Sequence, residues 1–516
     1  MSDNLIEGTL GTNFGNLTNL HCLSLFNNKI SGAIPPSLSN LKSLEYLNLQ
    51  ENFLTMELPT EIGNLSNIRW LLLCNNNLSG EIPPSIQKME QVEVLDLENN
   101  LFAGEIPTWL FDFNYLFYLS LGENKLVLKN ARIAPRCMLM RLSLRSCNLS
   151  GQIPIWISNQ TDLTFLDLSN NNLEGTLPQW LAQRDLSGLL LSNNKLSGSL
   201  PPHLFQSQFN FLILSNNNLL GLLPDTIGQA TKMIILRLSG NNFSGPIPTS
   251  ISNMLELMLL DLSSNRFSGN KFPVFNPKSS LFFIDLSSNK LSGQVPTTFP
   301  LGIKVLVLSQ NEFYHVLPQN LSNLNQMEYL DLHSNNIGGE IPNSLGELKN
   351  LKSLNLSQNK LSGRIPLSFG GLQSLESLDL SHNNFFGEIP CTLANLFELS
   401  YLDLSNNKLE GRIPSGPQMD RMNDPNSYAN NSGLCGMQIK VSCEKVPSAP
   451  KLKEEKTKKS NSWEIWFSWE MAVIGYPSGF LSTVLVMYVI GYFNITPQPG
   501  RRKRRRSPVR HGLFGF

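Results

Sequence analysis

The sequence has no excess of charge of either sign and few charged residues overall. Its 516 residues include 40 basic and 40 acidic side chains, and charged residues make up only 16% of the chain. A balanced chain produces no overall field that attracts nucleic acid. A hydrophobic content of 41% is also too high for intrinsic disorder. We therefore expect an ordered protein that does not bind nucleic acid.

Cysteine and histidine are scarce, and familiar catalytic motifs are absent. Seven cysteines exclude a disulfide-rich scaffold. The six histidines are scattered and suggest no metal site. The sequence has no P-loop, no H-E-x-x-H, no G-x-S-x-G and no protein-kinase motifs. The expectation is a protein that is not an enzyme, with no catalytic residue, metal or cofactor.

What the sequence does have is one repeated pattern. The phrase L-x-L-x-x-N-x-L recurs, for example as LDLSNNKL, at intervals of 22 to 24 residues. Such regularity indicates a solenoid, in which each turn buries its apolar face against its neighbours. Eighteen positions form the series, with Cys147 in place of Asn at one of them and Asn at 4, 28, 52, 76, 100, 124, 171, 194, 217, 241, 265, 289, 311, 335, 359, 383 and 407.

Each part of the repeat has a physical role. The two Leu of L-x-L point inward from a short strand, and the x residues point outward. The Asn can turn the chain and bond backbone groups of its own and neighbouring turns, which makes a buried ladder. Gly follows four residues later and Pro seven, each in fifteen of eighteen repeats. Gly permits a backbone conformation that other residues resist, and Pro ends ladder pairing. Parallel strands ~4.8 Å apart give a concave strip on the order of 80 Å long, suited to a protein, peptide or glycan.

The repeat and the end of the solenoid resemble a known family. The pattern LxxLxLxxNxLSGxIPxxLxxL resembles the plant-specific leucine-rich repeat. The run 351–443, with NSYANNSGLCG, is similar to the last repeats and cap of plant receptor-like proteins, the kinase-less relatives of receptor kinases. LRSCNLSGQIPIWI around Cys147 is similar to that family too. The resemblance covers residues 4–493. It implies an α/β solenoid: a right-handed plant-type leucine-rich-repeat superhelix with a parallel concave sheet, plus one C-terminal transmembrane helix.

These patterns divide the chain into five segments. Residues 471–493 have no charged side chain and are long enough for a bilayer that needs ~20 residues. RRKRRR at 501–506 marks the cytoplasmic side, and its place after a span favours anionic-lipid contact over a nuclear-localisation or nucleic-acid patch. The expected segments are a solenoid at 1–414, a cap at 415–443, an extracellular juxtamembrane linker at 444–470, a transmembrane helix at 471–493 and a short basic cytoplasmic tail at 494–516.

The predicted span also contains a small-residue motif. Gly475 and Gly479 form G-x-x-x-G, which lets two helices approach closely. The resemblance implies that such a motif packs against an adaptor receptor kinase. The outer flank is usually acidic in the family and is Lys-rich here, so this part of the pattern differs.

Two cysteine pairs have different expectations. The resemblance implies a disulfide between Cys435 and Cys443 that fixes the cap over the last apolar face, with two free thiols as the alternative. Cys137 and Cys147 could form a second pair. Because Cys147 replaces a buried ladder Asn, a structural thiol is the favoured reading there.

N-glycosylation sequons are frequent, and they apply only to a secreted chain. The candidates are Asn16, Asn64, Asn77, Asn148, Asn159, Asn242, Asn320, Asn355 and Asn430. Asn355 lies between two core Leu, where a glycan would obstruct the strip. The first residues contain no charged-then-apolar signal segment, so we expect a truncated chain whose signal peptide is missing. The rival is a tail-anchored protein with cytosolic repeats.

The outward strand positions vary along the array, and the early repeats carry aromatic side chains beside Arg. Such side chains are typical interface anchors, although ordinary variation in the first repeats is the alternative. We expect the ligand to contact Glu45, Tyr46, Arg69, Trp70, Glu93, Phe117, Tyr118, Arg141 and Arg145. Residues 330–414 resemble the repeats that the family offers to a co-receptor kinase.

The expected function follows from the resemblance and from the missing kinase. We expect a single-pass type I plasma-membrane receptor-like protein with extracellular repeats. It would recognise a peptide, protein or glycan elicitor and signal through a partner receptor kinase in plant defence. The alternatives are a developmental-signalling co-receptor, an inhibitor of a secreted enzyme, and a truncated receptor or receptor-kinase fragment.

Overall fold

The structure is a computed structural model that describes residues 2–129, 133–207 and 209–443. All of them belong to one unit, Met1–Val446. The predicted linker, membrane helix and basic tail lie outside the described residues, as do Gly475 and Gly479. Among the residues that are described, no helix is long and apolar enough to cross a membrane.

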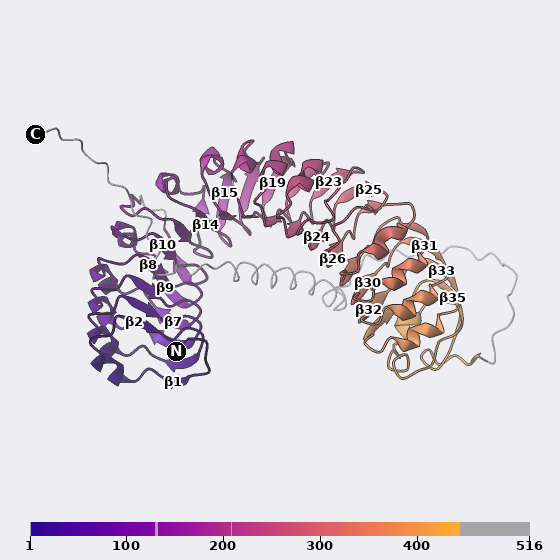
Figure 1. Cartoon of the computed structure of the whole chain (residues 1–516), viewed down its shortest axis with the longest axis horizontal. Helices are drawn as coiled ribbons and strands as arrows, with labels where there is room; N and C mark the ends of the chain where they lie inside the picture. The colour runs from indigo at the N-terminus through magenta and orange to yellow at the C-terminus, as the bar shows by residue number, and fades with distance from the viewer. Residues whose placement is uncertain (1, 130–132, 208, 444–516) are drawn as a thin grey trace, which may run out of the picture. The chain divides into compact units, whose positions relative to one another are not determined.

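A parallel ladder of short strands runs along the inner edge of the curved unit (Figure 1). Each even-numbered strand pairs with the next, from β2 to β34, and within the described chain no pairing joins these two end strands. The ladder is therefore an open sheet, as predicted. Its strands are β2 (Cys22–Ser24), β4 (Tyr46–Asn48), β6 (Trp70–Leu72), β8 (Val94–Asp96), β10 (Tyr118–Ser120), β12 (Arg141–Ser143), β14 (Phe165–Asp167), β16 (Gly188–Leu190), β18 (Phe211–Ile213), β20 (Ile235–Arg237), β22 (Leu259–Asp261), β24 (Phe283–Asp285), β26 (Val305–Val307), β28 (Tyr329–Asp331), β30 (Ser353–Asn355), β32 (Ser377–Asp379) and β34 (Tyr401–Asp403).

After each inner strand the chain turns and forms a strand of a second parallel ladder. It forms sheets of six, eight and five strands. The six-stranded sheet contains β1 (Glu7–Thr9), β3 (Lys29–Gly32), β5 (Phe53–Glu57), β7 (Asn77–Gly80), β9 (Leu101–Glu105) and β11 (Lys125–Val127). The eight-stranded sheet contains β13 (Ser150–Gly151), β15 (Asn172–Thr176), β17 (Lys195–Gly198), β19 (Asn218–Leu222), β21 (Asn242–Gly245), β23 (Arg266–Gly269), β25 (Lys290–Gly293) and β27 (Glu312–Phe313). The five-stranded sheet contains β29 (Gly338–Glu340), β31 (Lys360–Gly363), β33 (Asn384–Gly387), β35 (Lys408–Arg412) and β36 (Gly433–Cys435).

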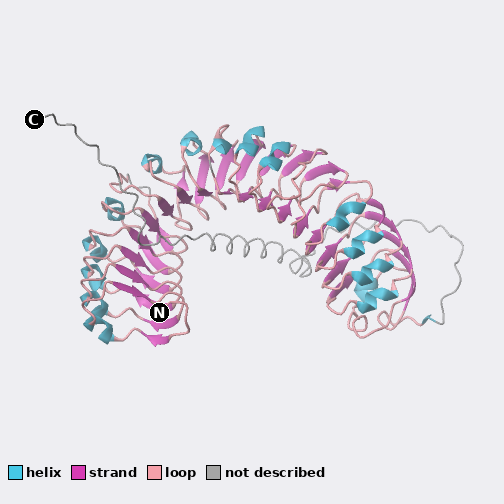
Figure 2. Ribbon diagram, viewed as in Figure 1, coloured by secondary structure: helices cyan, strands magenta, loops and turns pink. Residues whose placement is uncertain are grey.

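Short 3-10 helices return the chain along the outer side, where Figure 2 shows them in cyan. Most begin directly after the repeat's Pro, as η2 does after Pro35. Pro ends the pairing because it has no backbone N–H to donate. The helices are η1 (Thr12–Asn16), η2 (Pro36–Asn40), η3 (Thr60–Asn64), η4 (Pro84–Lys88), η5 (Thr108–Asp112), η6 (Ile155–Asn159), η7 (Gln179–Gln183), η8 (Leu204–Gln206), η9 (Asp225–Gln229), η10 (Thr249–Asn253), η11 (Gln319–Asn323), η12 (Asn343–Glu347), η13 (Leu367–Gly371), η14 (Cys391–Asn395) and η15 (Pro425–Tyr428).

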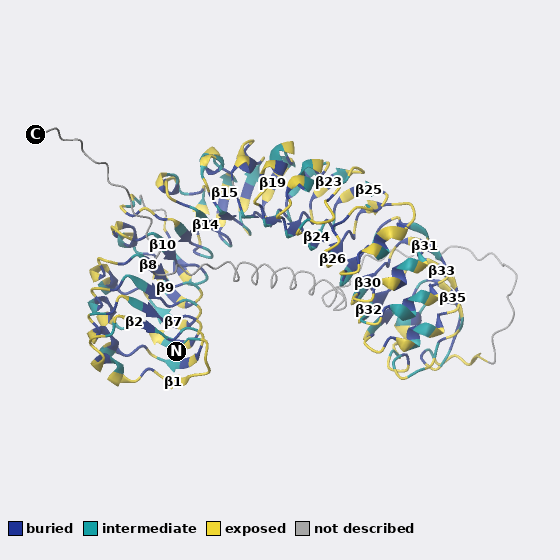
Figure 3. Ribbon diagram, viewed as in Figure 1, coloured by how far each residue is buried: buried dark blue, intermediate teal, exposed yellow. Residues whose placement is uncertain are grey.

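One continuous apolar core runs between the inner strands and the 3-10 helices (Figure 3). The two Leu of each L-x-L lie in it, as Leu354 and Leu356 do around β30. A single turn has no second layer to cover these side chains. Stacking the turns removes them from water, and burial of each Leu side chain contributes roughly 1.5–3 kcal/mol.

A ladder of Asn side chains joins successive turns, as the repeat predicts. The Nδ2 of Asn335 donates to the carbonyl of Leu308 in the preceding turn at 3.1 Å, and to those of Leu332 and His333 in its own turn. Its Oδ1 accepts from the backbone N–H of Phe313 at 3.0 Å. One buried side chain therefore satisfies four backbone groups of two turns.

The residue that turns the chain is not the ladder Asn but the residue before it. Asn27, Glu51 and Gln310 have φ of 52°, 53° and 53° in front of ladder positions. The Gly four residues after the Asn also has positive φ wherever it occurs. At the same position Met56 and His315 keep φ of 69° and 71°, which strains a residue with a β-carbon.

Replacing a ladder Asn should destabilise the solenoid far more than replacing its neighbour. Asn335→Ala removes the side-chain partner of the Leu308 and Leu332 carbonyls and of the Phe313 N–H, whereas the His333 carbonyl still accepts from the Gln310 N–H. We therefore expect a loss of about 3 kcal/mol in unfolding free energy. Asn336→Ala is the matched control, because Asn336 is exposed. Denaturant unfolding of both variants tests this. Equal stability of the two would contradict the role given to the ladder.

Candidate functional site

Six residues stand in one row across the early concave face. We call them the early row: Tyr46, Trp70, Val94, Tyr118, Arg141 and Phe165, the first residues of β4, β6, β8, β10, β12 and β14. Each lies opposite the next in the ladder register. All but Val94 are partly exposed. Four of the nine predicted contact residues are thus neighbours on one surface.

Within the early row, Tyr46 packs against Trp70, and Tyr118 and Phe165 pack against Arg141. The rings of Tyr46 and Trp70 lie 5.7 Å apart, centroid to centroid. The Arg141 guanidinium carbon lies 5.4 Å from the Tyr118 ring centroid and 3.8 Å from that of Phe165. Two rings therefore hold this cation in place by cation–π attraction. The sequence prediction missed Phe165, although its place at the start of TFLDLS marks it as a member of the row.

The other predicted charged residues are largely paired within the protein. Arg69 forms an ion pair with Glu93, and its Nε donates to Glu93 at 3.1 Å. The Arg145 Nε lies 2.5 Å from a carboxylate oxygen of Glu123, a residue that the prediction did not include. Glu45 is exposed. Phe117, which precedes β10, is half-buried.

Buried carboxylates lie next to the early row on the same face, at the last residues of β8 and β14. Burial, with the nearby charge of Glu98 second, raises the pKa of Asp96 to about 7. Burial also raises the pKa of Asp167 to about 6. The Tyr118 hydroxyl donates to Asp96 Oδ2 at 3.4 Å, and Gln50 Nε2 donates to the same oxygen at 3.2 Å. The predicted contact residues do not include either of these carboxylates.

Two buried polar atoms on β12 lack a hydrogen-bond partner in the described part of the chain: the Nε of Arg141 and the Oγ of Ser143. They belong to the first and last residues of one strand, so both side chains project to the concave side. Leaving a buried donor unpaired costs free energy that an acceptor atom of a ligand would recover. β12 therefore carries two polar groups whose hydrogen-bonding capacity the described chain leaves unused.

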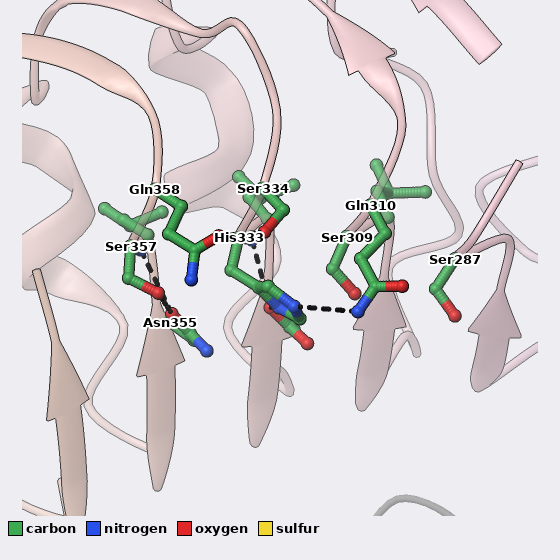
Figure 4. Close-up of polar contacts among 12 residues, drawn as sticks. Ser287, Ser309, Gln310, His333, Ser334, Asn355, Ser357 and Gln358 are labelled. Atoms are coloured by element: carbon green, nitrogen blue, oxygen red, sulfur yellow. Dashed lines mark hydrogen bonds and ion pairs between the residues drawn. The ribbon is translucent and has the colours of Figure 1, made fainter. Parts of the chain in front are cut away.

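The late concave face is different, as Figure 4 shows. Tyr329 and Tyr401 stand in the row equivalent to the early row, with Ser353 and Ser377 between them. The polar side chains beside this row bond to each other. Ser334 donates to Gln358 Oε1 at 2.8 Å, and Gln310 Nε2 lies 3.3 Å from His333 Nε2. Burial lowers the pKa of His333, but the hydrogen bond and charge of Asp331 outweigh it and raise the pKa overall. This face has the self-satisfied polar surface of a scaffold.

The two cysteine pairs differ in the structure. Cys435 and Cys443 form a disulfide with their Cα atoms 5.1 Å apart. Cys137 and Cys147 are both buried and free, and the Cys147 Sγ lies 3.5 Å from the carbonyl oxygen of Arg145.

Most candidate glycosylation sites are accessible, and one is not. The exposed or half-exposed residues are Asn16, Asn64, Asn77, Asn148, Asn159, Asn242, Asn320 and Asn430. Asn355 is only 7% exposed, and its Oδ1 accepts from the N–H and hydroxyl of Ser357. A glycan does not fit there.

Comparisons with known families identify the repeat. A model described as leucine rich repeat matches residues 339–385, and one for two copies matches 18–62. The single-repeat model matches 67–89, 91–113, 138–160, 162–183, 208–230, 232–254, 326–348 and 398–418.

Curated relatives and solved structures extend the comparison. Receptor-like protein 46 of Arabidopsis thaliana is 46% identical over 71 residues, which is 14% of this chain and 9% of that protein. The match thus spans less than a tenth of the relative's length. The Arabidopsis receptor kinase HAESA, solved with the peptide hormone IDA and the co-receptor SERK1, is 33% identical with a TM-score of 0.65, over 86% of this chain and 78% of that one. The plant peptide hormone receptor RGFR1, solved with RGF2, is 30% identical with a TM-score of 0.64, over 83% and 77%.

Asp96 should make stability depend on pH. Its folded pKa of about 7 exceeds the ordinary value of 3.8, so between these values the folded protein holds a proton that the unfolded chain has released. The unfolding free energy therefore falls as pH rises through this window. Asp96→Asn should remove part of that fall, and exposed Asp162→Asn should not. Denaturation midpoints between about pH 4 and pH 8 measure it, and parallel curves for wild type and Asp96→Asn would refute it.

Proposed function

The chain belongs to the plant leucine-rich-repeat receptor-like proteins, and we propose that it binds an extracellular ligand on the early row. The observation that carries this proposal is the chemistry of β4 to β14. The rings of Tyr118 and Phe165 hold Arg141, whose Nε is buried without a hydrogen-bond partner in the described chain, as is the Oγ of Ser143 on the same strand. Interfaces place such aromatic and Arg anchors at their centres. On the late concave face Ser353 and Ser377 separate Tyr329 from Tyr401, and the neighbouring polar side chains are paired.

The ligand class follows from the shape and charge of this surface. The early row is a long open strip without a closed cavity, which suits an extended peptide, a protein loop or a glycan. Arg69 and Arg145 are already neutralised by Glu93 and Glu123. Arg141 is thus the cation best placed to bind an acceptor of the ligand. The solved relatives contain bound peptide hormones, which supports a peptide as the first candidate.

We infer that the chain signals together with a partner that has kinase activity. The HAESA structure contains the co-receptor SERK1. By analogy, we assign to this chain an adaptor receptor kinase and a co-receptor kinase that contacts residues 330–414. We place the chain in the plasma membrane with its repeats outside the cell, in plant defence. A role in developmental signalling is the second candidate, favoured by the peptide-hormone receptors among the solved relatives.

The early row should be tested with three substitutions made together. Trp70→Ala, Tyr118→Ala and Arg141→Ala remove its central anchors, and we expect affinity for a peptide captured from apoplastic fluid to fall at least about tenfold. The matched control is Tyr329→Ala, Ser353→Ala and Tyr401→Ala, which changes first residues of β28, β30 and β34. Calorimetry or surface plasmon resonance measures both. Unchanged affinity in the early-row variant would place the ligand elsewhere.

Glycan mapping tests the extracellular placement. The protein isolated from the membranes of the plant that produces it should be sensitive to N-glycosidase, with Asn159 modified and Asn355 unmodified, because Asn159 ends an outer helix and Asn355 is buried. Asn159→Gln should remove one glycan's mass, whereas Asn355→Gln should change nothing. Mass spectrometry after deglycosylation in ¹⁸O water reads each site. A chain without any glycan would rule out the extracellular placement.

A further inference from the structure

A groove runs along the second ladder of the last repeats, away from the early row. Its volume is about 1130 Å³, and it passes the ends of β29, β31, β33 and β35 and the starts of η12 to η14. Figures 1 and 2 show these strands side by side with the 3-10 helices next to them. We call this surface the terminal groove.

Four charged side chains of alternating sign line the terminal groove, one from each repeat. They are Glu340, Arg364, Glu388 and Arg412, all exposed. The side chains of Glu340, Arg364 and Glu388 each extend along the ladder towards the next repeat. A β-carbon added at Gly363, for example, would lie 2.6 Å from Glu340 Cγ. Among the ion pairs of the described residues, none includes any of the four.

This charge order is complementary to itself when reversed. Consider a two-fold axis that lies in the plane of this surface, perpendicular to the ladder, between the repeats of Arg364 and Glu388. Rotation about this axis places each row of one copy against the same row of a second copy, in reversed order. Arg364 then faces Glu388 of the other copy, and Glu340 faces Arg412. Both contacts occur twice, as an isologous interface requires. All four charges gain an opposite partner.

The same axis also matches the two neighbouring rows. Phe386 is 47% exposed, and the operation places it over Ser362, whose small side chain leaves room for the ring. Leu367 is 66% exposed and comes to face Cys391, an exposed and weakly polar side chain. Charge, size and apolar character therefore agree on one symmetry operation.

We propose that the terminal groove is a contact between two copies of this chain, related by that two-fold axis. Four repeats span only about 15 Å between the first and last strands, so the contact is smaller than that of a stable dimer and is weak. The surface is open to it: from residue 321 to 429 of the described chain, the one sequon is the buried Asn355. This inference does not depend on the identity of the ligand.

The charge order allows an experiment with two variants that repair each other. Arg364→Glu alone places Glu against Glu twice in a pair of copies, and Glu388→Arg alone places Arg against Arg twice. When one copy carries Arg364→Glu and the other Glu388→Arg, both contacts are again opposite. The full chain is expressed in leaf cells as fluorescent donor and acceptor fusions, and energy transfer gives the apparent association constant.

We expect each variant with itself to associate about tenfold more weakly than wild type, and the mixed pair to return to the wild-type value. The readout is the difference between mixed and self pairs, so association through other segments does not affect it. Arg266→Glu, an exposed Arg on β23 outside the groove, should match wild type. A mixed pair no stronger than the self pairs, or association of this groove with another protein only, would overturn the proposal.

Discussion

Each ladder Asn must find all its hydrogen-bond partners in the dry space between two turns, and this requirement sets the geometry of the whole solenoid. The side-chain amide of Asn335, for example, donates to the carbonyl of Leu308 in the preceding turn and to that of Leu332 in its own turn, so it joins both turns at once. A shift of either turn would leave buried polar groups unpaired, at a cost of about 1–3 kcal/mol for each group. The turns therefore stack in a fixed register, and equivalent residues of successive repeats form straight rows.

The sequence predicts this framework well because its positions have fixed residue types. The inward Leu, the ladder Asn, the Gly and the Pro each have a single physical task, and the structure places them accordingly. The turn before the ladder Asn was not predictable in the same way. The left-handed conformation there is adopted by Asn27, Glu51 and Ser264, residues with little in common except their place in the turn. Tertiary stacking fixes this conformation, so composition does not reveal it.

The candidate site could be predicted only in part, because its chemistry depends on which neighbours meet across strands. Sequence position alone places Tyr46, Trp70, Tyr118 and Arg141 on outward strand sites. It does not show that Glu93 neutralises Arg69, or that Glu123 neutralises Arg145. Those pairings change the surface from one with three available Arg side chains to one in which Arg141 stands out. The unpaired Ser143 and the partner ring of Phe165 likewise become visible only in the register.

Equivalent residues of successive repeats form continuous rows. The same row can therefore favour association with a second copy in the last repeats and oppose it in the early ones. The position that carries Glu340, Arg364, Glu388 and Arg412 carries Glu57, Glu81 and Glu105 in earlier repeats, all exposed. A second copy laid on that earlier stretch by the same operation would meet like charges, which repel. Only Glu105 has a cation beside it, the Lys129 ammonium at 2.7 Å. Charge order thus directs a second copy to the last repeats. The contact lies on the second ladder, so the concave early row stays open to a ligand.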